Sequence, residues 1–323
     1  MENLQGVVVS GLELWQWRRQ ALAAARAADV PPEEVDWLLL AVADLDRLAL
    51  RLESFRDRKN MTLRLSLPEL DQLWQRRISD RLPVQYIAGV TPWRNFSLVV
   101  SPAVLIPRPE TELLIDLAVE AVRRRGAQEQ RSTGVSPVGA SEQVMQNSPM
   151  TDADWADLGT GSGAIAIGLA AAFPDATIHA VDRSTEALAI ARQNAQQQGL
   201  AEKIKFYNGF WFEPLEAIKG RLSGMVSNPP YIPSSIVPTL QPEVAFHEPH
   251  LALDGGEDGL DCIRHLIETA PNYLRPGGIW LIEMMAGQAD AVAELLRQNG
   301  SYYDIKIYPD LAGIERFALA YRC

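Results

Sequence analysis

The sequence predicts an α/β protein in which a mostly parallel, doubly wound sheet follows a small helical bundle. From about residue 154 onward, short apolar segments with strand character alternate with helical patterns, which is typical of a parallel sheet covered by helices on both faces. Before that, from Leu12 to about Arg81, apolar residues recur at helical spacing. At 323 residues the chain exceeds the usual size of one domain, so we expect one large and one small domain.

The first of these domains is expected to be a helical module over residues 1–84. Pro31-Pro32 precedes a run with apolar residues on one helical side, a position where proline is tolerated. Ser66 and Glu69 have the spacing of a capping box at the start of another helix. A bundle of about 80 residues is long enough to fold as a module, and we expect it to dock a partner.

Residues 85–107 are interpreted as a β-hairpin connector, because β-prone residues there are interrupted by glycine and proline. A helix is expected from Pro109 to about Arg125, acidic at its start and basic at its end as the helix dipole favours. Residues 126–152 are rich in Gly, Ser, Thr, Gln and Pro without periodicity and are expected to be a flexible insertion. The second domain is predicted to cover residues 108–323.

The strands and helices of the second domain follow from its alternating pattern. Helices are expected at 164–172, 186–198 and about 259–274, and strands at 155–158, 177–181, 204–207, 224–227 and 278–283. In an open sheet of this kind, a ligand binds at the carboxyl ends of the strands. The residues directly after the strands are therefore the candidates for a site.

Composition limits the classes of function. The hydrophobic content of 47% can fill complete cores, and the net charge of -11 disfavours broad contact with nucleic acid phosphates. A local basic patch remains possible around Arg18, Arg19, Arg76, Arg77 and Arg81. The two cysteines are too few for a disulfide framework or a zinc site. No stretch approaches the roughly 20 apolar residues that span a bilayer, so we expect a soluble protein. Because two cysteines are typical of a reducing compartment, we expect it in the cytoplasm.

A glycine-rich turn follows the first strand of the second domain, in the order Asp157-Leu158-Gly159-Thr160-Gly161-Ser162-Gly163. Glycine allows a sharp turn and close approach of a ligand to the backbone. The dinucleotide pattern needs two residues between its second and third glycines, whereas this turn has one. The turn instead resembles the S-adenosylmethionine loop of class I methyltransferases. Asp182 ends the next strand, where its carboxylate can accept from both hydroxyls of a ribose.

A second motif, Asn228-Pro229-Pro230-Tyr231, follows the fourth strand. The asparagine side-chain oxygen and a neighbouring proline carbonyl form a paired acceptor for one NH2 group, and the tyrosine supplies a face for the planar group that carries it. This arrangement suits methylation of an amide or exocyclic amine, where alignment with the donor lowers the barrier. Taken alone, the motif is equally compatible with an ordinary turn, because Pro and Asn dominate turns.

These motifs in this order, with flanking segments, resemble the HemK/PrmC family of peptide chain release factor glutamine methyltransferases. The flanking segments that match are Tyr86-Ile87-Ala88-Gly89, the run Ser101 to Glu112, Glu248-Pro249 and the run Leu251 to Asp261. The likeness covers nearly the whole chain, except the extreme N-terminus and residues 126–152. One departure follows Glu283, where Met285 stands at a position that is usually glycine in the family.

The resemblance implies a class I methyltransferase fold and methyl transfer from S-adenosylmethionine to the glutamine of the Gly-Gly-Gln motif of release factors. It implies a donor site formed by the turn from Asp157 to Gly163 with Asp182, Trp211 and Asn228. The same resemblance places the substrate glutamine against Asn228, Pro229, Pro230 and Tyr231. We expect a monomer, with no DNA or membrane partner.

Several alternatives stay open from the residues. A close relative of the family methylates a ribosomal protein, and the same motif would suit a flipped adenine in DNA. A protein that binds S-adenosylmethionine without catalysis is the third. Trp211 is also compatible with a place in the core, which is the commoner location of an aromatic side chain. His247, Glu248 and His250 lie close together, but Pro249 opposes the helix of a zinc peptidase motif, and no metal is expected. The acidic run Asp254 to Asp261 is interpreted as a glycine-rich turn and not as a calcium loop.

Overall fold

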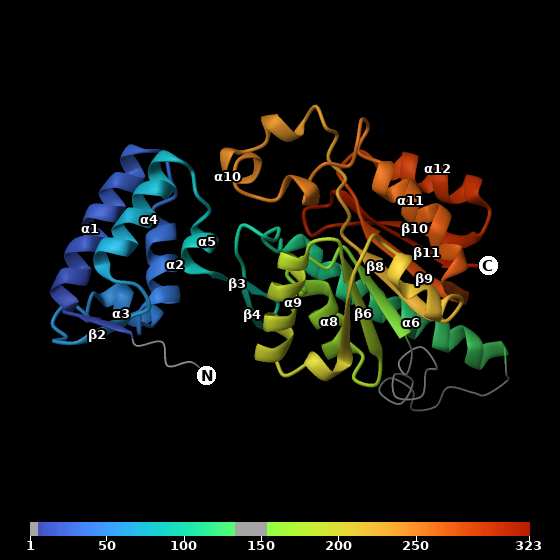
Figure 1. Ribbon diagram of the computed structural model, residues 1–323, viewed down its shortest axis with the longest axis horizontal. Helices are drawn as coiled ribbons and strands as arrows, with labels where there is room; N and C mark the ends of the chain where they lie inside the picture. The colour runs from blue at the N-terminus through green and yellow to red at the C-terminus, as the bar shows by residue number, and fades with distance from the viewer. Residues whose placement is uncertain (1–5, 133–153) are drawn as a thin grey trace. The chain divides into compact units, whose positions relative to one another are not determined.

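The structure is a computed structural model that describes residues 6–132 and 154–323 (Figure 1). It divides into two compact units. Unit 1 comprises the chain up to Thr91 with Val100–Pro102 and Leu240–His247, and unit 2 comprises Pro92–Val99, Ala103–Thr239 and Glu248–Cys323. Within the two described ranges, no helix is both long and apolar enough to cross a membrane.

Unit 1 is a helical bundle with one small sheet. Its helices are α1 (Gly11–Ala27), α2 (Glu33–Val42), α3 (Arg47–Leu52), α4 (Leu67–Ser79), α5 (Val84–Ala88) and α10 (Pro242–Ala245). The predicted capping box is confirmed, because Ser66 and Glu69 cap each other at the start of α4. The strand β1 (Val7–Val9) pairs antiparallel with β2 (Met61–Leu63), a sheet that the helical interpretation of this region did not include.

Most of the arginines that the sequence suggested for a basic patch form ion pairs with acidic residues. Arg77 is only 3% exposed and pairs with Glu34 of α2 and Glu243 of α10. Glu243 also binds Arg81, while Arg18 pairs with Asp36 and Glu53. Neutralised in this way, these side chains do not form a free cationic surface. Arg77 and Arg81 instead hold the segment Leu240–His247 within unit 1 through Glu243.

The connector is a β-hairpin in part. Strands β3 (Val90–Trp93) and β4 (Phe96–Val99) pair with each other as predicted. Tyr86 and Ile87, which were included in the hairpin region, lie in helix α5. This helix follows Pro83 and ends at Gly89, whose φ of 69° is left-handed. The flanking proline and glycine thus outweigh the β preference of the two residues between them.

Unit 2 contains a seven-stranded sheet in the order β10-β11-β9-β8-β5-β6-β7. Five strands are parallel, namely β5 (Asp154–Leu158), β6 (Thr177–Asp182), β7 (Ile204–Asn208), β8 (Leu222–Ser227) and β9 (Leu274–Glu283). The last two, β10 (Tyr302–Pro309) and β11 (Glu315–Arg322), add an antiparallel edge. The chain runs outward from β5 in both directions, so the carboxyl ends of β5 and β8 form a switch point where ligands bind.

Helices cover both faces of this sheet, as the alternating pattern predicts (Figure 1). One core contains residues of α6 (Leu113–Ser132), α8 (Ala164–Ala172) and α9 (Thr185–Gln197), and the other contains residues of α11 (Asp261–Thr269) and α12 (Ala289–Asn299). Short 3-10 helices complete the chain at Glu110–Glu112, Ala201–Lys203, Glu213–Ile218, Val237–Thr239, His250–Ala252 and Ala270–Asn272.

Two boundaries differ from those expected. Helix α6 continues to Ser132, so the first residues of the predicted insertion 126–152 are helical, and the rest of that segment lies outside the described residues. The expected helix at about 259–274 is shorter, because α11 ends at Thr269 and β9 already begins at Leu274. Pro271, at which the 3-10 helix Ala270–Asn272 interrupts the run, lacks the N–H that a continuing α-helix needs.

Candidate functional site

A cavity of about 230 Å³ lies at the switch point of the sheet in unit 2. It brings together residues from several separated segments, among them the glycine turn after β5, the end of β6, the segment after β7 that contains Trp211, and the motif after β8. The predicted site residues that line it are Gly159, Gly161, Asp182, Trp211, Asn228 and Pro230. The other predicted residues, Asp157, Thr160, Ser162, Gly163, Pro229 and Tyr231, surround this lining without being part of it.

The glycine turn needs its glycines for conformational reasons. Gly159, Gly161 and Gly163 all have positive φ, at 77°, 53° and 84°. A Cβ on Gly163 would lie 3.1 Å from the Cβ of Ala191, which is tighter than normal packing. The N–H groups of Gly159 and Thr160 both donate to the carbonyl of Val181, which fixes the turn against β6. The turn is therefore rigid, with open space at Gly161 facing the cavity.

Asp157 lies beneath this turn with no exposed surface. Its Oδ2 accepts from the Thr160 hydroxyl at 2.6 Å and from the Ala166 N–H at 2.9 Å. Its Oδ1 is buried and has no hydrogen-bond partner among the described residues. Burial raises the pKa of the carboxyl to about 7. An unpaired buried acceptor costs about 1–3 kcal/mol, so this atom is suited to a donor group supplied by a ligand.

Asp182, at the end of β6, presents its carboxylate to the same cavity. Oδ2 accepts from the Gly161 N–H at 2.8 Å and Oδ1 from the Ser184 N–H at 2.9 Å. Burial raises the pKa of this carboxyl, and the backbone donors oppose that rise. Each carboxylate oxygen has a further lone pair, so both remain able to accept from a ligand hydroxyl.

Trp211 belongs both to the core and to the cavity wall. It is 8% exposed and packs with the core that contains Leu158 and Val181, while its ring edge lies near Gly159. Its φ of 49° is unusual for a residue with a side chain, and its buried indole N–H has no partner among the described residues. The neighbouring Phe210, 38% exposed, also lines the cavity, although the sequence interpretation selected only Trp211 from this aromatic segment.

The motif after β8 is held by a buried polar network. Asn228 Nδ2 donates to Thr111 Oγ1 at 3.1 Å, and the Thr111 hydroxyl donates to Glu283 Oε2 at 2.7 Å. The other carboxylate oxygen of Glu283 accepts from the Tyr231 hydroxyl at 3.0 Å. Burial raises the pKa of Glu283 and of Tyr231. The tyrosine is therefore a neutral hydrogen-bond donor and does not act as a base.

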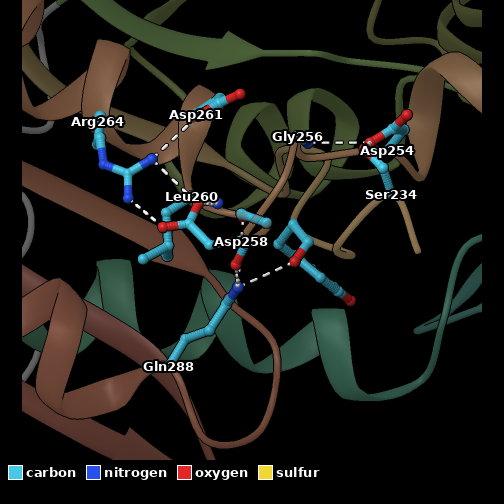
Figure 2. Close-up of polar contacts among 10 residues, drawn as sticks. Ser234, Asp254, Gly256, Asp258, Leu260, Asp261, Arg264 and Gln288 are labelled. Atoms are coloured by element: carbon cyan, nitrogen blue, oxygen red, sulfur yellow. Dashed lines mark hydrogen bonds and ion pairs between the residues drawn. The ribbon is translucent and has the colours of Figure 1, made fainter. Parts of the chain in front are cut away.

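The loop after the motif is fixed by Gln288, at the start of α12 (Figure 2). Its Nε2 donates to the Tyr231 carbonyl at 3.0 Å and to the Gly259 carbonyl at 3.3 Å, and its Oε1 accepts from the Met285 N–H. Met285, the residue that departs from the family pattern, does not line the cavity. Its backbone instead helps to orient the glutamine.

The acidic run Asp254 to Asp261 forms the turn expected for it, and the protein itself uses its carboxylates (Figure 2). Asp254 accepts from the Ser234 hydroxyl and the Gly256 N–H, while Asp258 and Asp261 both pair with Arg264. The histidines nearby have separate contacts: His247 meets the Asp80 carbonyl within unit 1, and His250 lies 3.9 Å from Asp254 in unit 2.

Sequence reasoning did not assign roles to Thr111, Glu283 or Gln288. For Glu283 a signal exists, because it is a single carboxylate at the end of the apolar strand run Ile279-Trp280-Leu281-Ile282. Such a charge is buried only when it has partners. Thr111 and Gln288 have no comparable signal, since nothing local distinguishes them from exposed polar residues.

Known proteins resemble this chain at several levels. The model of the family described as "Methyltransferase small domain" matches residues 139–238. The chain is 49% identical to the release factor glutamine methyltransferase of Synechocystis sp. over 97% of both chains, and 46% identical to that of Thermosynechococcus vestitus over 95% and 96%. Among solved structures, the catalytic domain of hMettl16, determined in complex with an RNA hairpin of the MAT2A 3'UTR, has a TM-score of 0.51 at 16% identity over 87% of each chain. This last likeness concerns the fold alone, which is that of class I methyltransferases.

Proposed function

Because the chain belongs to the release factor glutamine methyltransferase family, we propose that it methylates the side-chain amide nitrogen of the glutamine in the Gly-Gly-Gln motif of peptide chain release factors. The methyl donor is S-adenosylmethionine, which supplies a methyl group activated by a sulfonium. The observation that carries the proposal is the convergence of the glycine turn, Asp182 and Asn228 on one cavity. It supports a donor half and an acceptor half at the same edge of the sheet.

The donor half fits the groups of S-adenosylmethionine. The unpaired Oδ1 of Asp157 matches an ammonium donor, and Asp182 matches the ribose hydroxyls. Trp211 and Phe210 give the cavity an aromatic wall suited to adenine. Thr160 and Ser162 act indirectly, because both are buried and Thr160 orients Asp157.

The acceptor half orients a poor nucleophile. An amide nitrogen attacks only when its lone pair is aligned with the donor methyl carbon, so positioning contributes much of the rate. The Oδ1 of Asn228 and the carbonyl of Pro229 accept the two hydrogens of the substrate NH2, and Pro230 keeps this backbone rigid. These acceptors gain strength as positive charge develops on nitrogen. The methylated nitrogen is a strong acid, and it loses its proton to solvent.

The helical unit is proposed to dock the release factor, and the protein is proposed to act as a cytoplasmic monomer. Methylation of a ribosomal protein would use the same acceptor site with another partner. Methylation of DNA adenine is disfavoured by the net charge of -11 and by the ion-paired arginines of unit 1.

The test is a transfer assay with labelled S-adenosylmethionine and, separately, release factor, ribosomal protein and DNA. We expect label in release factor that disappears when the glutamine of Gly-Gly-Gln is changed to alanine. Label in DNA, or label in release factor that survives this change, would contradict the proposal.

A second test separates the two halves of the site. Asn228→Ala removes one of the two acceptors, so kcat is expected to fall by about 100-fold or more. Donor affinity, measured by titration of tryptophan fluorescence, is expected to stay within about threefold, because Asp157, Asp182 and the glycine turn are unchanged. An equal loss of transfer and donor affinity would make Asn228 chiefly a donor-binding residue.

A further inference from the structure

We propose that Thr111 and Glu283 are positioning residues that determine which atom of the Asn228 side chain faces the substrate. The inference rests on the proposed function, because it concerns how the acceptor site recognises an NH2 group. An asparagine amide presents an oxygen acceptor at one end and an NH2 donor at the other. Only the orientation with Oδ1 toward the substrate can accept from a glutamine NH2. The reverse orientation would place two donors against each other.

The network selects the productive orientation by the direction of its hydrogen bonds. A threonine hydroxyl has a single hydrogen, and in Thr111 it is donated to Glu283 Oε2 at 2.7 Å. While Glu283 is ionised, its carboxylate accepts only, so this direction cannot reverse. Thr111 therefore offers Asn228 a lone pair, and the atom that meets it at 3.1 Å is Nδ2. Oδ1 is left for the substrate.

The same carboxylate fixes the other end of the motif. Glu283 Oε1 accepts from the hydroxyl of Tyr231, the residue for which the sequence motif predicts a ring face against the substrate amide. Thr111 is 4% exposed and Glu283 is 2% exposed, so water does not compete for these bonds. One buried group thus sets the amide orientation and the ring position together.

Three elements that are distant in sequence contribute to this hydrogen-bond network. Thr111 lies in the 3-10 helix Glu110–Glu112, Glu283 ends β9, and Asn228 follows β8. Because β8 and β9 are adjacent parallel strands, Asn228 and Glu283 leave the sheet at the same edge. Thr111 bridges them from outside the sheet.

The first test replaces Thr111 in the full-length protein with release factor as substrate. Thr111→Val keeps the shape but removes the hydroxyl, so the amide is no longer held in one orientation. We expect kcat to fall by about tenfold or more, with donor affinity within about twofold of wild type. Thr111→Ser is the matched control, because it keeps the hydroxyl, and it should retain kcat within about threefold.

A second readout distinguishes positioning from a purely structural role. A release factor with glutamate in place of the Gly-Gly-Gln glutamine presents only acceptors, so the wild-type site should bind it weakly as a competitive inhibitor. Thr111→Val allows Asn228 to present its NH2 group, and we expect the preference for glutamine over glutamate to fall by about tenfold. A variant that is merely less stable would lose affinity for both proteins in proportion.

Glu283→Gln gives an independent test if Thr111→Val folds poorly. Glutamine turns one of the two acceptor atoms into a donor. Where this NH2 group meets Thr111, the hydroxyl must accept from it and donate to Asn228 instead, and the same loss of preference is expected. A retained preference in both variants, together with wild-type kcat, would overturn the inference while release factor methylation stands. Absence of methyl transfer to release factor by the wild-type protein would instead contradict the proposed function itself.

Discussion

The buried carboxyl of Asp157 leads to a quantitative prediction of how the stability of the ligand-free protein depends on pH. Its pKa is raised on folding from 3.8 to about 7, chiefly by burial. The folded protein therefore binds this proton more tightly than the unfolded chain does. The stability that results is fully present below about pH 4 and is lost as pH rises through about 7. Asp157→Asn cannot titrate, so it lacks this pH dependence.

The size of the effect follows from the shift. Between pH 5 and pH 8.5, the wild-type protein should lose about 2–3 kcal/mol of unfolding free energy relative to Asp157→Asn. This corresponds to a relative change in Tm of roughly 3–5 °C for a chain of this size. The substitution also places an amide NH2 where Oδ1 lacked a partner, but that cost is the same at both pH values.

The assay is thermal unfolding of ligand-free wild type and Asp157→Asn at both pH values, with Glu268→Gln as an exposed-carboxylate control in α11. We expect the Tm difference between wild type and Asp157→Asn to shift in favour of the variant at pH 8.5. With excess S-adenosylmethionine the order should reverse, because the ligand stabilises only the protein that it binds tightly. A Tm difference that is the same at both pH values would refute the reasoning.

Three further predictions concern other parts of the molecule. Gln288→Leu leaves the Tyr231 and Gly259 carbonyls without their shared donor, so kcat for release factor should fall about tenfold, while Gln298→Leu on the exposed side of α12 should have little effect. Arg77→Met leaves Glu34 and Glu243 without a buried partner and should lower the unfolding free energy by about 3 kcal/mol in urea titrations, against under about 1 kcal/mol for Arg76→Met, whose pair with Asp80 is exposed. The rate of methyl transfer should fall on acidification as Glu283 takes up a proton, and it should do so at a higher pH than an ordinary glutamate because burial raises the pKa of this group. In that last case Thr111, Tyr231, Arg316 and Glu110 are the groups that act on the carboxyl, and a pH-independent rate at saturating substrate would contradict the assignment.

Much of the fold could be predicted from sequence because each strand of the parallel sheet is locally apolar and bounded by turn residues. The glycine turn and the motif at Asn228 could also be placed, since both directly follow predicted strands and parallel strands share their carboxyl edge. Their convergence on one cavity then follows from topology. The short helix α5 was missed because its capping residues outweigh the β preference of Tyr86 and Ile87.

The support beneath the motif could not be predicted in the same way. Thr111 contacts Asn228 across 117 positions and Glu283 across 172, and neither separation leaves a periodic or local pattern. Whether a threonine hydroxyl reaches a carboxylate depends on the register of β9 against β8 and on where the chain enters α6. These are properties of packing, which sequence patterns do not specify.

The carboxyls of Asp157, Asp182 and Glu283 at this sheet edge have two different roles that pH can distinguish. Asp157 has an oxygen without a partner among the described residues, and Asp182 faces the cavity. Their charges are therefore suited to the ammonium group and the ribose hydroxyls of the methyl donor. Glu283 has a hydroxyl on each oxygen, so neither oxygen lacks a partner and its charge acts through Thr111 and Tyr231. Acidification should therefore weaken donor binding through Asp157, and at saturating donor it should lower kcat through Glu283. In Asp157→Asn the first effect should shrink to the part that Asp182 contributes and the second should remain, a separation that one shared titrating group could not produce.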